Sequence, residues 1–130
     1  MMTNGSATEN PRGALGRFGE ETAARYLLAH GYEVLARNWR CGREGELDVV
    51  ALSPQRDCVV VVEVKTRRST QYGSPLEAVT WAKARRLRRL AGAWCQANEP
   101  SAPYVRIDVI GVLVLGDRPP QITHVEAVGS

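Results

Sequence analysis

The stretch that most constrains the fold of this chain is a run of four valines, residues 59–62, followed by Glu63, Val64 and Lys65. β-branched residues favour strands, and an uninterrupted apolar run is typical of a strand that is buried on both faces. Glu63 and Lys65 share one face of this strand, because side chains alternate along it. Charges on a buried element are costly unless they are paired, hydrogen-bonded or bound to a metal. The run therefore predicts a central strand whose two charges need partners.

A second charged strand is predicted just upstream, over residues 45–52. One face carries Glu46 and Asp48, and the other is apolar, formed by Leu47, Val49 and Ala51. Residues 53–57 make a short loop, so the two charged strands form an antiparallel hairpin. Counting outward from this loop places Asp48 and Glu63 within about one residue pair of each other. Their carboxylates can share a ligand if they face the same way.

The remaining patterns predict a single α/β domain over residues 12–130, preceded by a disordered arm over residues 1–11. A helix is expected over residues 12–30, ended by Gly31, with an apolar stripe of Leu15, Phe18, Ala23, Tyr26 and Leu27. A strand follows at residues 32–39. A second helix is expected from Pro75, capped by Ser74, to about Asn98. Strands at residues 104–115 and 121–128, separated by a turn at 117–120, complete an α-β-β-β-α-β-β order and a mixed five-stranded sheet flanked by helices.

Charge is distributed unevenly along the chain, although the net charge is only +3. Between residues 65 and 89 there are eight Lys and Arg residues against the single acid Glu77. Such a local basic field suits a polyanion, while the alternative is an ordinary solvated helix face. Three widely spaced cysteines argue against a disulfide framework or a zinc site, and neither a leader peptide nor a membrane span is recognised. A soluble cytoplasmic protein is therefore expected.

The acidic pair and the lysine together predict metal-assisted phosphodiester hydrolysis. Mg²⁺ takes oxygen ligands, commonly one or two carboxylates together with water and substrate phosphate. Asp48 and Glu63 supply carboxylates, the carbonyl of Val64 offers a third oxygen, and Lys65 could orient the nucleophile or stabilise the charge that grows on the phosphate. The alternative is a ladder of ion pairs, with Asp48 bound to Lys65 and Glu63 bound to an arginine. The histidines, His30 and His124, are interpreted as structural.

Two further charged residues stand close to apolar stripes. Glu20 lies at the border of the first helix's stripe and Glu21 on its wetter side; Glu20 could also be an ordinary helix glutamate favoured by the dipole. Lys83 falls within the stripe of the second helix. It either extends its methylenes along that stripe toward water or points at the same site as Glu63.

Several motifs resemble the YraN-like family of small bacterial proteins, in the PD-(D/E)XK endonuclease-like superfamily. They are Gly19-Glu20, Asn38-Trp39-Arg40, Gly45-Glu46-Leu47-Asp48, Val62-Glu63-Val64-Lys65-Thr66-Arg67, Gly73-Ser74-Pro75, Lys83 and Arg106-Ile107-Asp108-Val109. The likeness implies a restriction-endonuclease-like core, with Asp48 and Glu63 as metal ligands and Lys65 as the catalytic lysine. It also implies that Glu20 contacts the metal directly or through water, and that Glu46 and Lys83 are accessory residues. The chain departs from this family at Val61 and at Glu126-Ala127-Val128, where relatives carry aromatic residues.

The expected function is therefore a Mg²⁺- or Mn²⁺-dependent endonuclease that acts on DNA, branched or otherwise structured, in repair, recombination or DNA processing. Nucleic-acid contacts are expected from the basic loop and helix, at Arg67, Arg68, Arg85, Arg86 and Arg89. The alternative is a nucleic-acid-binding module that keeps the fold without cleaving. A third reading is a structural domain whose charges form only ion pairs. The same resemblance extends to archaeal Holliday-junction resolvases, and a role of that kind would call for a homodimer, because two strands must be cut.

Overall fold

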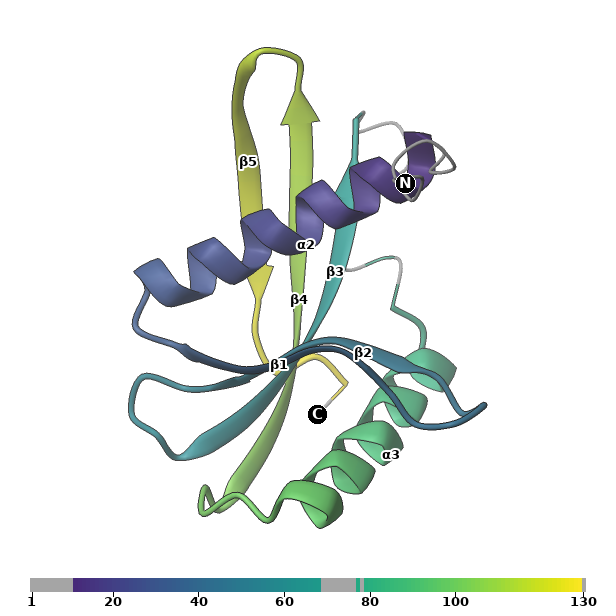
Figure 1. Cartoon of the computed structure of the whole chain (residues 1–130), viewed down its shortest axis with the longest axis vertical. Helices are drawn as coiled ribbons and strands as arrows, with labels where there is room; N and C mark the ends of the chain where they lie inside the picture. The colour runs from purple at the N-terminus through teal and green to yellow at the C-terminus, as the bar shows by residue number, and fades with distance from the viewer. Residues whose placement is uncertain (1–10, 69–76, 78, 130) are drawn as a thin grey trace, which may run out of the picture.

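The structure, a computed structural model, describes residues 11–68, 77 and 79–129 (Figure 1). Its elements are α2 (Pro11–Ala29), β1 (Glu33–Arg40), β2 (Glu46–Leu52), β3 (Cys58–Arg67), α3 (Trp81–Asn98), β4 (Tyr104–Leu115) and β5 (Arg118–Val125). The predicted α-β-β-β-α-β-β order is confirmed. The predicted arm over residues 1–11 lies outside the described residues, except for Pro11, where α2 begins.

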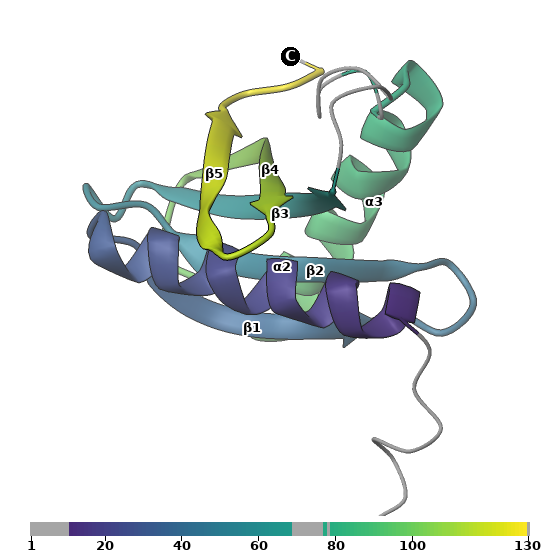
Figure 2. The same cartoon turned by 90° about the horizontal axis from the view of Figure 1, so that it is seen from above.

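The five strands form one mixed sheet in the order β1-β2-β3-β4-β5. All neighbours are antiparallel except β3 and β4, which are parallel because the chain crosses over through α3 between them. Helix α2 covers one face of the sheet and α3 covers the other (Figures 1 and 2). This is the restriction-endonuclease-like α/β core that the sequence predicts.

The valine strand separates two apolar clusters, one on each face of the sheet. Val59 and Val61 pack toward α3, against residues such as Leu87 and Trp94. Val60 and Val62 pack on the other face, with Ala23 and Leu27 of α2 among their partners. All four valines have no exposed surface, so β3 is buried on both faces as its composition predicts.

The sheet splits between β2 and β3. Their ladder of paired residues runs from Leu52 and Val59 to Val49 and Val62 and stops there. Beyond that point β2 continues in its pairing with β1 as far as Glu46, while β3 continues in its pairing with β4 as far as Arg67. The two halves of the sheet diverge, β1 and β2 on one side and β3, β4 and β5 on the other (Figure 1).

One strand departs from the predicted alternation at this split. Leu47 packs in the α3 cluster, whereas Val49 and Ala51 pack in the α2 cluster, so the prediction that all three share a face is wrong. Opposite Asp48 in the β1–β2 register lies Asn38, whose φ of 51° is in the left-handed region. The alternation is interrupted here because β2 turns away from β3 while β1 bends with it.

Three other predictions differ from the structure at element ends and on one helix face. Helix α3 begins at Trp81 with Thr80 as N-cap, because the Thr80 side chain accepts a hydrogen bond from the Lys83 N–H. The expected start at residues 74–75 lies outside the described residues, and Val79 and Thr80 are not helical. Strand β5 begins at Arg118 and ends at Val125, because an edge strand tolerates Pro119 and Pro120. Phe18, expected in the buried stripe of the first helix, is 46% exposed.

Two smaller expectations can also be compared with the structure. The three cysteines are unpaired, as their spacing predicts. Neither described helix combines the length and the apolar character needed to cross a membrane.

Candidate functional site

Asp48 and Glu63 are the first residues beyond the last β2–β3 pair, at the point where the sheet splits. Asp48 spans the opening, since its Oδ2 accepts a hydrogen bond of 2.9 Å from the N–H of Val64 on β3. In a strand, the N–H and C=O of one residue point to the same edge. The Val64 carbonyl therefore faces the split on the same edge as Asp48. The Asp48 carboxylate and the Val64 carbonyl therefore lie at the split, and Glu63 precedes Val64 on β3.

Glu63 is held by two lysines. Its Oε2 lies 2.5 Å from the Lys83 Nζ and 3.4 Å from the Lys65 Nζ. Glu63 is only 6% exposed, so these contacts provide the compensation that a buried carboxylate needs. Lys83 thus points at Glu63 rather than extending along the apolar face to water. Among the described residues, the alternative ion pairs of Asp48 with Lys65 and of Glu63 with an arginine are not formed.

A cluster of carboxylates surrounds the split. The pKa of Asp48 is raised to about 7, first by burial and then by the neighbouring carboxylates of Glu63, Glu20 and Glu46, against the opposing hydrogen bond from Val64. The pKa of Glu20 is also raised, chiefly by burial and by Glu46, with a smaller contribution from Glu63. Glu20 of α2 and Glu46 of β2 are therefore close enough to Asp48 and Glu63 to act on their charge. The split gathers more negative charge than its lysines alone neutralise.

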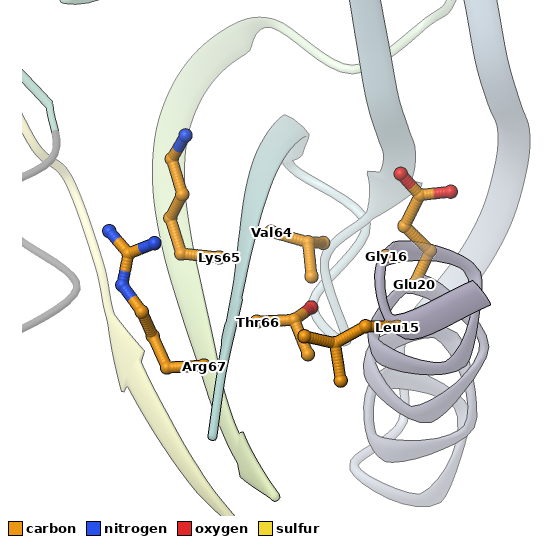
Figure 3. Close-up of a pocket in the computed structure, with 7 residues that line it drawn as sticks. All are labelled: Leu15, Gly16, Glu20, Val64, Lys65, Thr66 and Arg67. Carbon is orange, nitrogen blue, oxygen red and sulfur yellow. The ribbon is translucent and has the colours of Figure 1, made fainter. Parts of the chain in front are cut away.

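A cavity of about 250 Å³ lies beside this cluster, between the first half of α2 and the end of β3 (Figure 3). Val64 and Thr66 point toward α2 and its Glu20, whereas Lys65 and Arg67 point to the other side of β3 (Figure 3). The cavity is lined by Leu15, Gly16, Glu20, Val64, Lys65, Thr66 and Arg67. The cavity is therefore walled by apolar and hydroxyl side chains with Glu20 at its edge, whereas the cationic ends of Lys65 and Arg67 lie on the other side of β3 (Figure 3).

Helix α2 approaches β3 closely at one glycine. A Cβ on Gly19 would lie 1.8 Å from the Thr66 Oγ1, so only glycine fits there without a shift of α2 or of Thr66. The next residue is Glu20. The close contact at Gly19 therefore fixes the distance between Glu20 and the split.

The donor set suits a hard divalent cation, but the ligands are not assembled in advance. Asp48, Glu63 and the Val64 carbonyl are all oxygen donors, as Mg²⁺ and Mn²⁺ prefer. Within the described part of the chain, however, no three His, Cys, Asp or Glu side chains converge into a ready-made metal site. Glu63 is turned to its lysines instead. Glu63 could help to hold a cation here if it gave up its contact with one of the two lysines.

Comparison with known proteins decides the family. A model described as "Uncharacterised protein family UPF0102" matches residues 19–112. The chain belongs to this family. A UPF0102 protein of Arthrobacter sp. (strain FB24) is 51% identical over 115 residues, which cover 88% of this chain and 95% of the relative. A UPF0102 protein of Streptomyces coelicolor is 50% identical over 125 residues, which cover 95% of each chain.

The family match confirms the resemblance seen in the sequence. The UPF0102 window at residues 19–112 contains every carboxylate and lysine of the site, from Glu20 to Lys83. A UPF0102 protein of Clavibacter michiganensis is 59% identical over 99 residues, covering 76% of this chain and 81% of the relative. The family assignment covers the site as a whole rather than one motif.

The arginines expected to contact nucleic acid lie in two places in this UPF0102 protein. Arg67 lines the cavity at the end of β3, and Arg68 follows it at the surface. Arg85, Arg86 and Arg89 are exposed on α3. Arg68 and these three α3 arginines form no ion pair with any described residue. Lys83 of the same helix contacts Glu63, so the α3 arginines lie on the helix that reaches the split.

The sequence interpretation missed a buried polar network that joins α2, β4 and β5. Asp108 is fully buried and accepts hydrogen bonds from the Arg106 guanidinium, from the backbone N–H of Ala127 and, at 2.7 Å, from the His124 Nε2. The other ring nitrogen of His124 lies 3.1 Å from the Tyr26 hydroxyl, and Arg106 also donates to the Tyr32 hydroxyl. The sequence offered one signal, an Arg-x-Asp pair on one face of an apolar strand. In this UPF0102 fold Asp108 lies opposite Val62 on the neighbouring strand, so the network connects α2 and β5 to the strand pair beside the split.

Proposed function

We propose that this protein is a divalent-metal-dependent endonuclease that hydrolyses phosphodiester bonds in DNA, with structured or branched DNA as its substrate. The observation that carries the proposal is the placement of Asp48 and Glu63 at the mouth of a split between two strands, with Lys65 on the same strand as Glu63. Carboxylates that face each other across such an opening, next to a lysine, suit a site for a cation and a phosphate together.

Asp48, Glu63 and the Val64 carbonyl would hold the Mg²⁺ or Mn²⁺, and Glu20 would reach it directly or through water. A bound divalent cation supplies charge neutralisation at the scissile phosphate and favours ionisation of the attacking water. The raised pKa of Asp48 supports this assignment, because an excess of carboxylate charge at a buried place is relieved when a cation is added.

Lys65 and Lys83 have separate tasks in this proposal. The Lys65 ammonium group lies near Glu63, where it can orient the water or stabilise the charge that develops on the phosphate oxygens. Lys83 compensates Glu63 while no cation is present. If Glu63 served as a ligand of the cation, the Lys83 ammonium would be free to contact the phosphate. Glu46 adds negative charge beside Asp48 and Glu20 and is an accessory residue.

A second candidate function is a nucleic-acid-binding module that does not cleave. The observation that favours it is the pairing of Glu63 with both lysines, which leaves this carboxylate already compensated. If that arrangement persists when nucleic acid binds, the lysines are not available for chemistry and the basic surface of α3 alone is used.

Metal binding is tested by thermal unfolding with and without Mn²⁺. We expect millimolar Mn²⁺ to raise the melting temperature, since a ligand that binds only the native state stabilises it. Asp48→Ala should abolish the shift, while Glu44→Ala, which removes an exposed carboxylate from the β1–β2 turn, should keep it. No shift in the wild-type protein would exclude the metal site.

Catalysis is tested by incubating labelled junction, flap and linear duplex DNA with the protein and Mg²⁺ or Mn²⁺. We expect cleavage of a branched substrate that Lys65→Ala loses and that Arg56→Ala, an exposed substitution at the far end of the β2–β3 hairpin, retains. Intact substrates combined with salt-dependent binding would establish the binding module instead. Equal cleavage by wild type and Lys65→Ala would assign the activity to a contaminant.

A further inference from the structure

Trp81 is the most exposed of the large apolar side chains that the structure describes. It is the first residue of α3 and is 73% exposed, whereas Trp94 of the same helix is buried. Burial of an aromatic ring is strongly favourable, so an indole held in water at the start of a helix is unusual. Trp81 therefore adds little to the core, and a reason for an exposed indole must be sought in where it stands.

Trp81 stands at the end of α3 that faces the split. Lys83, two residues later, reaches Glu63. Successive helix residues are turned by about 100°, so Trp81 and Lys83 leave the helix in nearly opposite directions. Lys83 therefore points inward to the candidate site, and Trp81 points outward from the same turn. A nucleic-acid strand that leaves the site across this end of α3 passes Trp81 after about one helix diameter, roughly 10 Å.

Unpaired cations continue the same stripe of the helix. Arg85 and Arg88 lie four and seven residues after Trp81, which places all three on one outward face. Both arginines are exposed, and neither forms an ion pair with a described residue. Helix α3 also contains no acidic residue between Trp81 and Asn98. An aromatic ring followed by a row of cations matches the composition of surfaces that bind single-stranded nucleic acid.

We propose that Trp81 stacks on an unpaired base adjacent to the phosphodiester bound at the split, while Arg85 and Arg88 contact the backbone that continues along α3. This inference rests on the proposed function, because it places the strand by the site at Asp48 and Glu63. Bases inside an intact duplex are stacked on each other and offer no free face to an indole. The substrate class is therefore nucleic acid with unpaired nucleotides beside the cleaved bond, such as a flap or a splayed branch.

Binding of labelled oligonucleotides to the full-length protein in EDTA tests the inference without cleavage. We expect Trp81→Ala to bind oligothymidylate at least about five-fold more weakly, the loss that removal of one stacked base produces. A blunt hairpin duplex should be bound almost equally by both proteins. Trp81→Tyr should retain most of the affinity, because a phenol ring still stacks.

Tyr104→Ala is the matched control, since Tyr104 is also an exposed aromatic, at 63%, but lies beside Cys58 at the opposite end of β3. Oligothymidylate affinity that is unchanged in Trp81→Ala, or lost equally in Tyr104→Ala, would overturn the inference. So would a Trp81→Ala protein that changes only its oligomeric state, which would assign the indole to a subunit contact. Absence of any single-strand binding by the wild-type protein would also overturn it.

The outcome is separable from that of the proposed function. If the protein cleaves DNA with metal and Trp81→Ala binds oligothymidylate as well as wild type, only the stacking role of Trp81 is rejected. If Trp81→Ala weakens oligothymidylate binding in EDTA, but the wild-type protein shows neither cleavage nor a melting-temperature shift with Mn²⁺, only the nuclease proposal is rejected. The single-strand binding surface is then retained.

Discussion

Asp48 carries the main electrostatic consequence of the split. It is largely buried, it lies near three other carboxyl groups, and it accepts a hydrogen bond from the backbone N–H of Val64. The sequence predicts that Asp48 and Glu63 are neighbours, because the length of the loop between their two strands sets the register of the hairpin. The lysine contacts of Glu63 could not be predicted in the same way. They depend on how α3 is rotated, which local sequence does not determine.

The first prediction concerns the pH dependence that Asp48 imposes on stability. Its pKa is about 7 in the folded protein and close to 3.8 when unfolded, so the protonated form is favoured by folding. This contribution to stability is complete below pH 4 and is lost as the pH rises through 7. Without metal, Asp48→Asn should therefore raise the unfolding free energy at pH 8, by about 1–3 kcal/mol, and leave it little changed at pH 4.

Urea unfolding in EDTA at the two pH values measures this difference. Glu44→Gln, at an exposed carboxylate, serves as the control and should change stability at neither pH. Asp48→Asn should in addition remove the stabilisation by Mn²⁺. A variant that is less stable than wild type at pH 8 in EDTA would show that Asp48 is not under electrostatic strain.

At the level of secondary structure, α2 and β4 were easier to predict than β5 and the start of α3. Strand β4 has its predicted bounds, because residues 104–115 are a run rich in Val, Ile and Leu that ends at the predicted turn of residues 117–120. Helix α3 was placed too early, since Ser74 and Thr80 are both acceptable N-caps and local sequence does not choose between them. The change of face between Leu47 and Val49 could not be predicted from the local sequence for a different reason. It arises from the divergence of β2 and β3, which is a property of the sheet.

The second prediction uses two glycines of α2 as a matched pair. Gly19→Ala places a Cβ 1.8 Å from the Thr66 Oγ1, so α2 or Thr66 must move, and we expect a loss of about 1–3 kcal/mol in stability. Gly16→Ala meets nothing within 4 Å and should stabilise the protein by about 0.5–1 kcal/mol through helix propensity.

Chemical denaturation of the two variants gives the comparison. Because Glu20 follows Gly19, the Gly19→Ala protein should also show a smaller Mn²⁺ shift, while Gly16→Ala should keep the wild-type shift. Equal stability of the two variants would mean that the contact between α2 and β3 is looser than the structure indicates.

For the whole molecule, the Asp108 network connects segments that are distant in sequence. Tyr26 of α2, His124 of β5 and the Ala127 N–H near the C-terminus all converge on a residue of β4. Hydrogen bonds from His124, Arg106 and Ala127 hold the pKa of Asp108 below its usual value although burial opposes them. Sequence patterns predicted that the strand carrying Asp108 exists. They did not predict its partners, which come from three other parts of the fold.

The third prediction concerns this network. Asp108→Asn should lower stability at pH 7 by about 3 kcal/mol, because it leaves Arg106 without its buried counter-charge. In the wild-type protein the contribution of Asp108 is present above pH 4, near the pKa of the unfolded chain, and is lost as the pH falls through the lower folded pKa. The variant should therefore lose less stability than wild type on acidification.

Thermal unfolding between pH 7 and pH 2 compares the two proteins, with Asp117→Asn in the exposed β4–β5 turn as control. The control should follow the wild-type curve. If the melting temperatures of wild type and Asp108→Asn fell in parallel with decreasing pH, Asp108 would not contribute to the loss of stability in acid.

The split in the sheet has a consequence for solubility as well. A strand edge without a neighbour is a template on which another chain can add a strand, and β3 has no ladder partner among the described residues on its β2 side beyond Val62. At that edge the Val64 N–H already donates a hydrogen bond to the Asp48 carboxylate, and β3 also carries the charged side chains of Glu63, Lys65 and Arg67. Charge on an open edge opposes aggregation. The residues proposed for chemistry thus also keep the most apolar strand of the protein from associating with copies of itself.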